Sequence, residues 1–328
     1  MALGTAAAVD QFRTAFPGKV VTPEVKPKYQ GAVTRPWSQT CWTPAAGYVY
    51  LSNVQELTEA LAIVKKTGSK FAIRKTGHNP NAGFSSADET AIVLDIRQFQ
   101  SKELTSDGVA RAGSGNTWAR CIVTRFDLET HPLINVQYTI NLYSPDDHVE
   151  INKATVAVQK AMEDDPKTGR AVCSVTTQVS QELYEEVYKS WTEVCKTLPA
   201  GCVLHYTIQP MGKAGVEAGK DRGENIMGHE SIPQCWWVFT CEWPQEGSDD
   251  AVAQQAVNKM SETVHSLARE AGLLLDFKCM SFSMASQRVL GSYGAENIKR
   301  MQEAAAKYDP EGVFQKLQYG GFLLRNNV

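Results

Sequence analysis

A loop rich in turn-forming residues follows a short apolar segment and carries a single histidine. Residues 73–86 read IRKTGHNPNAGFSS, and after Arg74 they include two glycines, one proline, two asparagines, two serines and His78. Such a loop lets successive backbone N–H groups converge on an anion such as a pyrophosphate, because no large side chains intervene. An ordinary surface loop has the same composition, so these residues alone leave both interpretations open.

A strand, a helix and a second strand lead into this loop. Ser52 with Gln55 predicts a capping box at the start of the helix, and Gly68 suits the left-handed residue that ends it. We expect the second strand, KFAIR, to run parallel to the first through a right-handed crossover. Two more strand-like runs follow at residues 91–96 and 108–115.

Composition and charge exclude several classes of protein. The 328 residues suggest about two domains, and a net charge of -3 argues against nucleic-acid binding. No apolar run is long enough for a membrane span, and the start MALGTAAAVDQF lacks the basic residues of a signal peptide. The eight cysteines show neither CxxC nor metal-ligand spacing, so we expect no metal site, no disulfide framework and a cytoplasmic location.

The rest of the chain mixes strands and helices at both short and long spacings. Strands are expected within residues 122–143 and at 202–210 and 235–243, and helices at 146–164, 182–198 and about 249–271. This mixture predicts an α+β fold.

The loop resembles the phosphate-binding loop of the berberine-bridge-type FAD-linked oxidoreductases, which belong to the vanillyl-alcohol-oxidase-like group with a PCMH-type FAD-binding domain. The resemblance continues at Trp37, through residues 48–74 and into the tail at 292–322, which is similar to that of fungal members. It implies that the loop binds FAD and that His78 carries the flavin covalently. The cofactor-binding residues that it implies are Arg74, Gly77, His78, Asn79, Gly83, Ser85 and Ser86.

The chain departs from the family pattern at three places. After GSGNTW the family continues into a second half of the flavin domain, whereas here Trp118 is followed by ARC and then Ile122. In CMSFS, residues 279–283, Ser281 and Phe282 stand where the family has Asn and Tyr, so hydrogen-bonding groups that would face the flavin are lost. In the loop, Lys75-Thr76 replaces a pair of glycines.

We therefore expect a truncated PCMH-type domain packed on a substrate domain whose antiparallel sheet is backed by helices. The partial FAD-binding domain would span residues 1–121, the substrate domain 122–299, and a tail at 300–328 would return to the first domain. Because a cofactor site normally encloses most of its ligand, FAD would lack one wall unless a second subunit supplied it, and we expect a homodimer. A clean monomer in gel filtration would exclude the dimer.

The predicted substrate domain offers three candidate catalytic residues. In the strand CWWVFTCEW, Trp236, Val238, Thr240 and Glu242 share one face, while the alternate residues form an apolar face that suits the core. Glu242 is the only carboxylate on its face and a candidate general base, although a solvated glutamate at a strand edge fits as well. Tyr206 and Tyr138 are further candidates from neighbouring strands, and residues 221–230 resemble a loop that closes over the substrate.

Three functions remain open. The resemblance implies a specialised-metabolite enzyme in which FAD takes a hydride from a small molecule and oxygen reoxidises the flavin. A flavin-free enzyme could instead use the vacated pocket for a cyclisation or cycloaddition of the Diels–Alder kind, which needs mainly orientation. The third possibility is a non-catalytic remnant that binds a partner.

Overall fold

A computed structural model describes residues 3–104, 110–116, 168–221, 225–244 and 250–328. The strands expected at residues 122–143, the helix expected at 146–164, the candidate Tyr138 and the proposed boundary at 121–122 lie outside the described residues.

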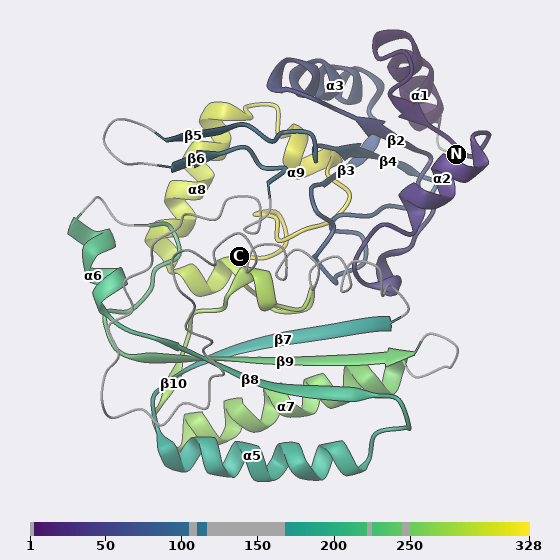
Figure 1. Ribbon diagram of the computed structural model, residues 1–328. Coiled ribbons are helices and arrows are strands. Elements are labelled where there is room, and N and C mark those ends of the chain that lie inside the picture. Colours follow the sequence, from purple (N-terminus) through teal and green to yellow (C-terminus); the bar gives the residue numbers. More distant parts are fainter. Residues whose placement is uncertain (1–2, 105–109, 117–167, 222–224, 245–249) are drawn as a thin grey trace, which may run out of the picture.

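The first sheet is mostly parallel. Its order is β1 (Val20–Val21), β2 (Gly47–Tyr50), β4 (Ala91–Asp95) and β3 (Lys70–Arg74). Both β2 and β3 run parallel to β4, and β1 pairs antiparallel with β2. The parallel orientation predicted for the first two strands is confirmed, but β4 lies between them rather than leaving them as neighbours (Figure 1).

Helices cover this sheet and enclose its apolar side chains. They are α1 (Leu3–Ala15), α2 (Lys26–Val33) and α3 (Val54–Thr67), with a short 3₁₀ turn η1 at Gln39–Cys41. Phe12, Val49, Val64, Phe71 and Leu94 are buried in one cluster between α1, α3 and the strands. A hairpin of β5 (Lys102–Leu104) and β6 (Ala110–Ala112) follows β4.

The N-cap of α3 lies one residue after the predicted position, so the predicted capping box of Ser52 and Gln55 is wrong. Asn53 is the N-cap, and its side chain accepts a hydrogen bond from the Glu56 N–H at 2.9 Å. The Glu56 carboxylate in turn accepts from the Ser52 N–H at 2.8 Å, so Gln55 has no part in the cap. The helix ends at Gly68, whose φ of 66° confirms the predicted left-handed residue.

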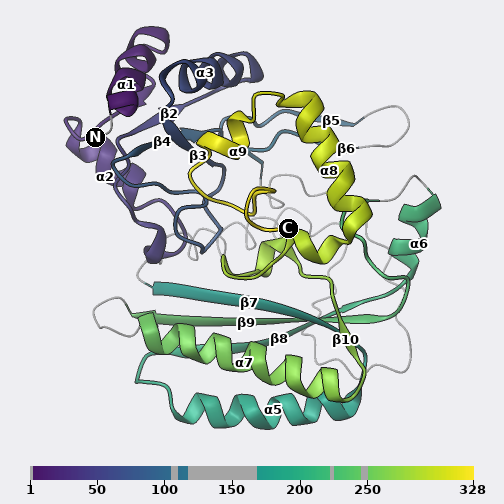
Figure 2. The same ribbon diagram turned by 180° about the vertical axis from the view of Figure 1, so that it is seen from behind.

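The second sheet is antiparallel, with the order β10 (Leu274–Leu275), β7 (Thr168–Gln178), β9 (Gln234–Pro244) and β8 (Val203–Met211). Helices α5 (Gln181–Lys196) and α7 (Asp250–Glu270) lie on one face, while the short α6 (Ala214–Asp221) follows β8 (Figures 1 and 2). The alternation predicted for β9 is confirmed, because Trp237, Phe239 and Cys241 are fully buried against these helices. The other face of the sheet is turned toward the rest of the molecule.

The C-terminal region returns to the first sheet. It contains the 3₁₀ turns η4 (Met280–Phe282) and η5 (Leu290–Tyr293) and the helices α8 (Ala295–Tyr308) and α9 (Val313–Leu317). Phe314 packs edge-on against Phe71 at 5.8 Å between ring centroids, and the Tyr319 N–H donates to the Phe71 carbonyl. The boundary proposed at residue 300 falls inside α8, so the C-terminal segment is continuous with this helix.

The described elements combine a mostly parallel and an antiparallel sheet with helices on their outer faces, which confirms the α+β class. Within the described residues, no helix has both the length and the apolarity that a bilayer span requires.

Candidate functional site

The loop that carries His78 leaves the first sheet at the carboxyl ends of its parallel strands. β3 ends at Arg74 and β4 at Asp95, and these two residues are register partners. β2 ends beside them at Tyr50. In sheets with parallel strands, ligands bind at this edge, because the loops that follow neighbouring strands meet there.

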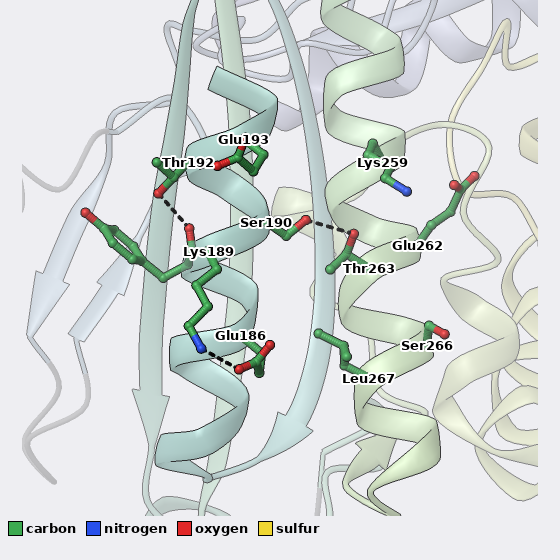
Figure 3. Close-up of a pocket in the computed structure, with 11 residues that line it drawn as sticks. Glu186, Lys189, Ser190, Thr192, Glu193, Lys259, Glu262, Thr263, Ser266 and Leu267 are labelled. Atoms are coloured by element: carbon green, nitrogen blue, oxygen red, sulfur yellow. Dashed lines mark hydrogen bonds and ion pairs between the residues drawn. The ribbon is translucent and has the colours of Figure 1, made fainter. Parts of the chain in front are cut away.

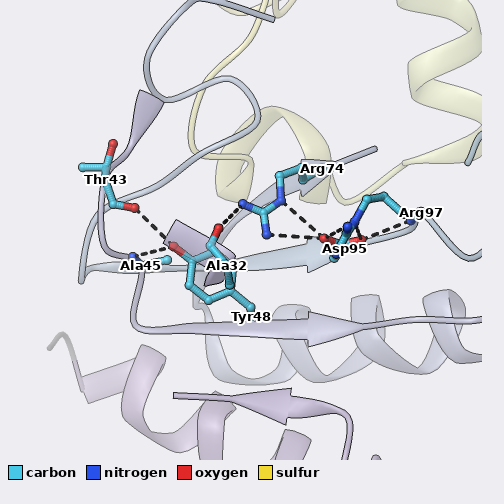
Figure 4. A network of polar contacts seen from close by, with 7 residues as sticks. All are labelled: Ala32, Thr43, Ala45, Tyr48, Arg74, Asp95 and Arg97. Carbon is cyan, nitrogen blue, oxygen red and sulfur yellow. Dashed lines mark hydrogen bonds and ion pairs between the residues drawn. The ribbon is translucent and has the colours of Figure 1, made fainter. Parts of the chain in front are cut away.

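Arg74 is structural, which corrects the expectation that it contacts a cofactor. Its side chain is 1% exposed, and its guanidinium donates to the Asp95 carboxylate at 3.3 Å and to the Ala32 carbonyl at 2.8 Å (Figure 4). The same guanidinium lies 4.9 Å from the centroid of the Tyr48 ring. Asp95 also accepts from Arg97, so one buried carboxylate binds two arginines and fixes the ends of β3 and β4 together.

The first half of the loop is held by residues 36–41. The Gly77 carbonyl accepts from the Trp37 N–H at 3.0 Å, and the Pro80 carbonyl accepts from the Thr40 hydroxyl at 3.2 Å. Gly77 has a φ of 82°, and a Cβ there would lie 3.3 Å from the Pro36 Cα. Only glycine therefore allows both the backbone turn and this close approach.

The middle of the loop binds the segment CMSFS, so two sequence motifs 202 residues apart are brought together. The Asn81 side-chain amide donates to the Ser283 carbonyl at 2.9 Å, and its oxygen accepts from the Ala285 N–H at 2.8 Å. The Ser283 hydroxyl also lies 2.9 Å from that of Ser174 on β7. Asn81 was not among the predicted site residues, and its sequence surroundings carry no signal of this long-range contact.

The C-terminal tail packs on the second half of the loop. The Tyr319 hydroxyl donates to the Asp88 carboxylate at 2.8 Å. Hydrogen bonds from the Thr90 side chain and, to a smaller extent, from Tyr319 lower the pKa of Asp88. Phe84 meets Phe322 edge-on at 4.9 Å. A Cβ on Gly320 would lie only 2.5 Å from the Gly83 carbonyl oxygen, so this crossing requires a glycine.

The predicted cofactor-binding residues other than Arg74 lie together in this loop. His78 is exposed, Gly77 and Gly83 have positive φ, and Ser85 is buried with no hydrogen-bond partner for its hydroxyl. Asn79 and Ser86 shape the loop, since their side chains accept from the N–H groups of Asn81 and Gly83 respectively. An unpartnered buried hydroxyl beside left-handed glycines fits a loop that receives a phosphate-bearing ligand.

Glu242 is linked to this loop through Arg170 and Trp37. Arg170 and Glu242 are register partners on β7 and β9, and Arg170 Nε donates to the Glu242 carboxylate at 3.0 Å. The Arg170 guanidinium lies 4.0 Å from the centroid of the Trp37 ring and also donates to the Trp37 carbonyl. The Trp37 N–H donates to the Gly77 carbonyl. Arg170 and Trp37 therefore connect the candidate base Glu242 to Gly77, the residue before His78.

Tyr206 lies on the opposite face of the same sheet. Its hydroxyl donates to the Tyr184 carbonyl at 3.1 Å, and its ring packs edge-on against Trp237 and Phe239 in the core beneath α5. Burial raises the pKa of the Tyr206 phenol above its ordinary value. The structure therefore does not bring Tyr206 and Glu242 to one site.

A pocket of about 880 Å³ lies elsewhere, on the outside of the helix layer. It is a groove between α5 and α7, where Ser190 and Thr263 are 3.3 Å apart and Lys189 pairs with Glu186 (Figure 3). The antiparallel sheet separates this groove from the loop, so we do not assign it to the same site. Among the described residues, no cluster of histidines, cysteines or carboxylates has the arrangement of a metal site.

Residues 45–121, which include the loop, match the family model of the FAD binding domain. An FAD-dependent monooxygenase of Arthrobotrys oligospora is 23% identical over 429 residues, covering 88% of this chain and 84% of that protein. An FAD-dependent monooxygenase of Fusarium proliferatum is 38% identical over 116 residues, which is 35% of this chain and 22% of the relative.

A solved structure shares the fold. Wild-type BBE-like 1 of Physcomitrella patens superposes with a TM-score of 0.52 at 8% identity, and the match covers 95% of this chain and 98% of that one. At this identity the likeness concerns architecture alone, and it agrees with the two-sheet arrangement described above.

Proposed function

We infer that this chain is a berberine-bridge-type FAD-linked oxidoreductase and that it oxidises a small organic molecule with FAD. The observation that carries this proposal is the position of the His78 loop. It lies at the carboxyl edge of a parallel sheet, inside the region that matches an FAD binding domain, and it bonds directly to the segment 279–285 beside the antiparallel sheet. A cofactor held by this loop would meet residues from both sheets.

Different residues of the loop would contribute to cofactor binding in different ways. Gly77 and Gly83 keep side chains away from the backbone where phosphate oxygens would approach, and the Ser85 hydroxyl supplies a donor that has no partner on the chain. His78 is exposed beside them and is the residue through which the chain would attach the flavin. When bound, FAD supplies a two-electron acceptor that oxygen can reoxidise.

The substrate side of the proposal centres on Glu242. Its side chain is 28% exposed, and Arg170 binds its Oε1, so Oε2 is the oxygen through which it would accept a proton. Arg170 is itself 7% exposed and held by Trp37 and by the Ser38 hydroxyl, which accepts from the Arg170 N–H at 3.0 Å. This rigid support would orient the carboxylate rather than leave it as a free surface glutamate.

A flavin-free cyclase is the second candidate. The 429-residue alignment to the Arthrobotrys protein is longer than the whole 328-residue chain, so part of that relative has no counterpart here. This difference supports the proposal that the second half of the FAD-binding domain is absent, in which case a partner subunit would have to complete the cofactor site. Without such a partner, the vacated space would serve a reaction that needs orientation and no redox group.

The absorbance spectrum of the purified protein separates the two candidates. The proposed function predicts a flavin spectrum, either as purified or after incubation with FAD and removal of unbound cofactor. The His78→Ala variant should bind less flavin, while His205→Ala, which changes an exposed histidine on β8, should match the unmodified chain. A folded protein that stays colourless in excess FAD would exclude flavin oxidation and leave the cyclase.

A further inference from the structure

Three side-chain amides from distant parts of the chain, those of Asn81, Gln287 and Asn327, hold the irregular segment 283–290. This segment runs from the end of η4 to the start of η5 and contains no strand, so a sheet does not supply partners for its backbone groups. Buried backbone N–H and carbonyl groups require such partners. A carboxamide offers both donors and an acceptor, as a peptide group does, and can therefore take the place of a neighbouring strand.

Gln287 joins this segment to the uncovered edge of β7. Within the described residues, β10 pairs only with Thr176 and Thr177, so no strand covers this edge at Ser174. The Gln287 side chain lies there instead, since its Nε2 donates to the Ser174 carbonyl at 2.8 Å and its Oε1 accepts from the Ser174 N–H at 3.3 Å. The same oxygen accepts from the Met284 N–H at 2.9 Å, which fixes the segment to the sheet.

The C-terminal tail binds the segment through Asn327. Its Nδ2 donates to the Gln287 carbonyl at 2.9 Å. Its Oδ1 accepts from the N–H groups of Val289 and Leu290, both at 2.8 Å. Asn327 is only 8% exposed, and the C-terminal end of the chain lies between the two sheets in both views (Figures 1 and 2). Loss of this side chain would leave three backbone groups without partners.

Asn81 joins the other end of the segment to the loop that carries His78. Its side chain binds the Ser283 carbonyl and the Ala285 N–H, and it lies three residues after His78. The Asn79 side-chain oxygen accepts from the Asn81 N–H at 2.9 Å and from the Asn81 amide at 3.0 Å. A displacement of the segment would therefore be transmitted to the loop at residues 79–81.

We propose that Gln287 and Asn327 are positioning residues for the His78 loop and act on it through the segment 283–290. Asn327 and Asn81 bind opposite ends of the segment, and Gln287 fixes its middle to β7. The tail and the loop are therefore coupled through one set of backbone groups. The proposal rests on the proposed function only for its consequence, which is that a displaced loop holds flavin less well.

Hydrogen exchange in the loop of the full chain tests this coupling without any ligand. The N–H groups of Asn81, Gly83 and Phe84 are hydrogen-bonded within the loop, so their exchange reports its local opening. Asn327→Leu removes three hydrogen bonds and should accelerate this exchange at least tenfold. Asn327→Asp removes only the donor to Gln287 and should accelerate it about fivefold, the effect of one hydrogen bond. Unchanged loop exchange in the folded Asn327→Asp variant would overturn the proposal.

The matched control is Asn53→Ala, which removes the N-cap of α3. Its side chain accepts only from the Glu56 N–H, so the variant should lower the melting temperature and leave loop exchange unchanged. This control separates a specific opening of the loop from a general loss of stability. Equal acceleration in Asn53→Ala and Asn327→Asp would overturn the positioning role.

A double variant tests whether both amides act through the same segment. Asn81→Ala and Asn327→Asp should each accelerate the exchange of the Gly83 and Phe84 N–H groups. Because the two changes release one shared segment, the double variant should exchange at most about twofold faster than the faster single variant. Accelerations that multiply would show independent effects and contradict the proposal.

Flavin content per folded molecule gives the functional readout. Asn327→Asp should hold less flavin than Asn53→Ala after both have been incubated with FAD. A normal flavin content in a variant with accelerated loop exchange would overturn the positioning role. If the unmodified chain binds no flavin, the proposed function fails, whereas the exchange measurements still decide whether the tail and the loop are coupled.

Discussion

The guanidinium of Arg170 lies over the ring of Trp37, 4.0 Å from its centroid, and joins two parts of the fold that are far apart in sequence. Trp37 belongs to the segment that holds the His78 loop, and Arg170 belongs to the strand that pairs with Glu242. The stacked guanidinium also donates to the Trp37 carbonyl and to the Glu242 carboxylate. This one side chain therefore connects the proposed cofactor loop with the proposed catalytic carboxylate.

Replacement of Arg170 by lysine should lower the free energy of unfolding by about 1–3 kcal/mol, because lysine cannot stack and bond in the same planar geometry. Urea unfolding would measure this change. The control is Lys189→Met, which removes an exposed pair with Glu186 and should change stability by about 0.5 kcal/mol or less. Equal effects of the two variants would contradict the connecting role of Arg170.

Arg74→Lys should reduce stability without changing the amount of flavin bound per folded molecule. The guanidinium is enclosed by Asp95, Ala32 and Tyr48, so its loss weakens the sheet edge and removes no contact with a ligand. We expect a loss of about 2–4 kcal/mol, as for other buried charged hydrogen-bonded groups. Thermal unfolding and quantification of flavin in the folded fraction would test both statements. A variant that keeps its stability but binds less flavin would indicate that Arg74 contacts the cofactor.

Gly320→Ala should release the C-terminal tail from the loop. The new Cβ would lie 2.5 Å from the Gly83 carbonyl oxygen, which is backbone and cannot move aside without shifting the loop. We expect faster proteolysis after residue 308 and a lower melting temperature. Gly219→Ala in α6 has open space around the new Cβ and should leave both properties unchanged or improve them slightly.

Stability should fall as the pH drops below about 6.5. Burial lowers the pKa values of His229 and His265 below 6.5 in the folded state, whereas both histidines titrate normally in the unfolded chain. Between the lowered folded value and 6.5, the unfolded chain binds more protons, so acid favours unfolding and this stabilisation is complete only above 6.5.

Urea unfolding at several pH values would follow this loss, and the variant His229→Phe should show a weaker dependence between pH 5 and 6.5. Carboxylates with lowered pKa, such as Asp88, lose their contribution at a lower pH, below their ordinary value of 3.8. The pH range in which the histidines reduce stability can therefore be separated from the range in which the carboxylates do so. Stability that stays constant from pH 7 to 5 would contradict the burial of both imidazoles.

Local patterns predicted the elements well, because each element satisfies a rule that acts over a few residues. The alternation in β9 separates Trp237 and Phe239 from Trp236 and Glu242 as the period of a strand requires. Gly68 ends α3 because a left-handed residue is needed there. The predicted N-cap of α3 was wrong by one position, because Asn53 and Ser52 are both good N-cap residues and the sequence alone does not choose between them.

The contacts that build the site could not be predicted in the same way. Arg74 lies beside the loop in sequence, yet its burial against Asp95 depends on the pairing of β3 with β4. Asn81 meets Ser283 across 202 residues, and no local spacing signals that contact. The sequence indicated only that His229 lies in a loop. It could not predict that His229 Nε2 is buried without a hydrogen-bond partner, because this depends on tertiary packing.

The exposed His78, in a loop that fits a phosphate-bearing ligand, is proposed to attach a flavin. Mass spectrometry of the tryptic peptide 76–97, which contains His78, tests it most directly after the protein has been loaded with FAD and precipitated in acid. If His78 attaches the flavin, this peptide gains the mass of one flavin, and the gain disappears in His78→Ala. An unmodified peptide from a folded protein with its loop intact would contradict the claim.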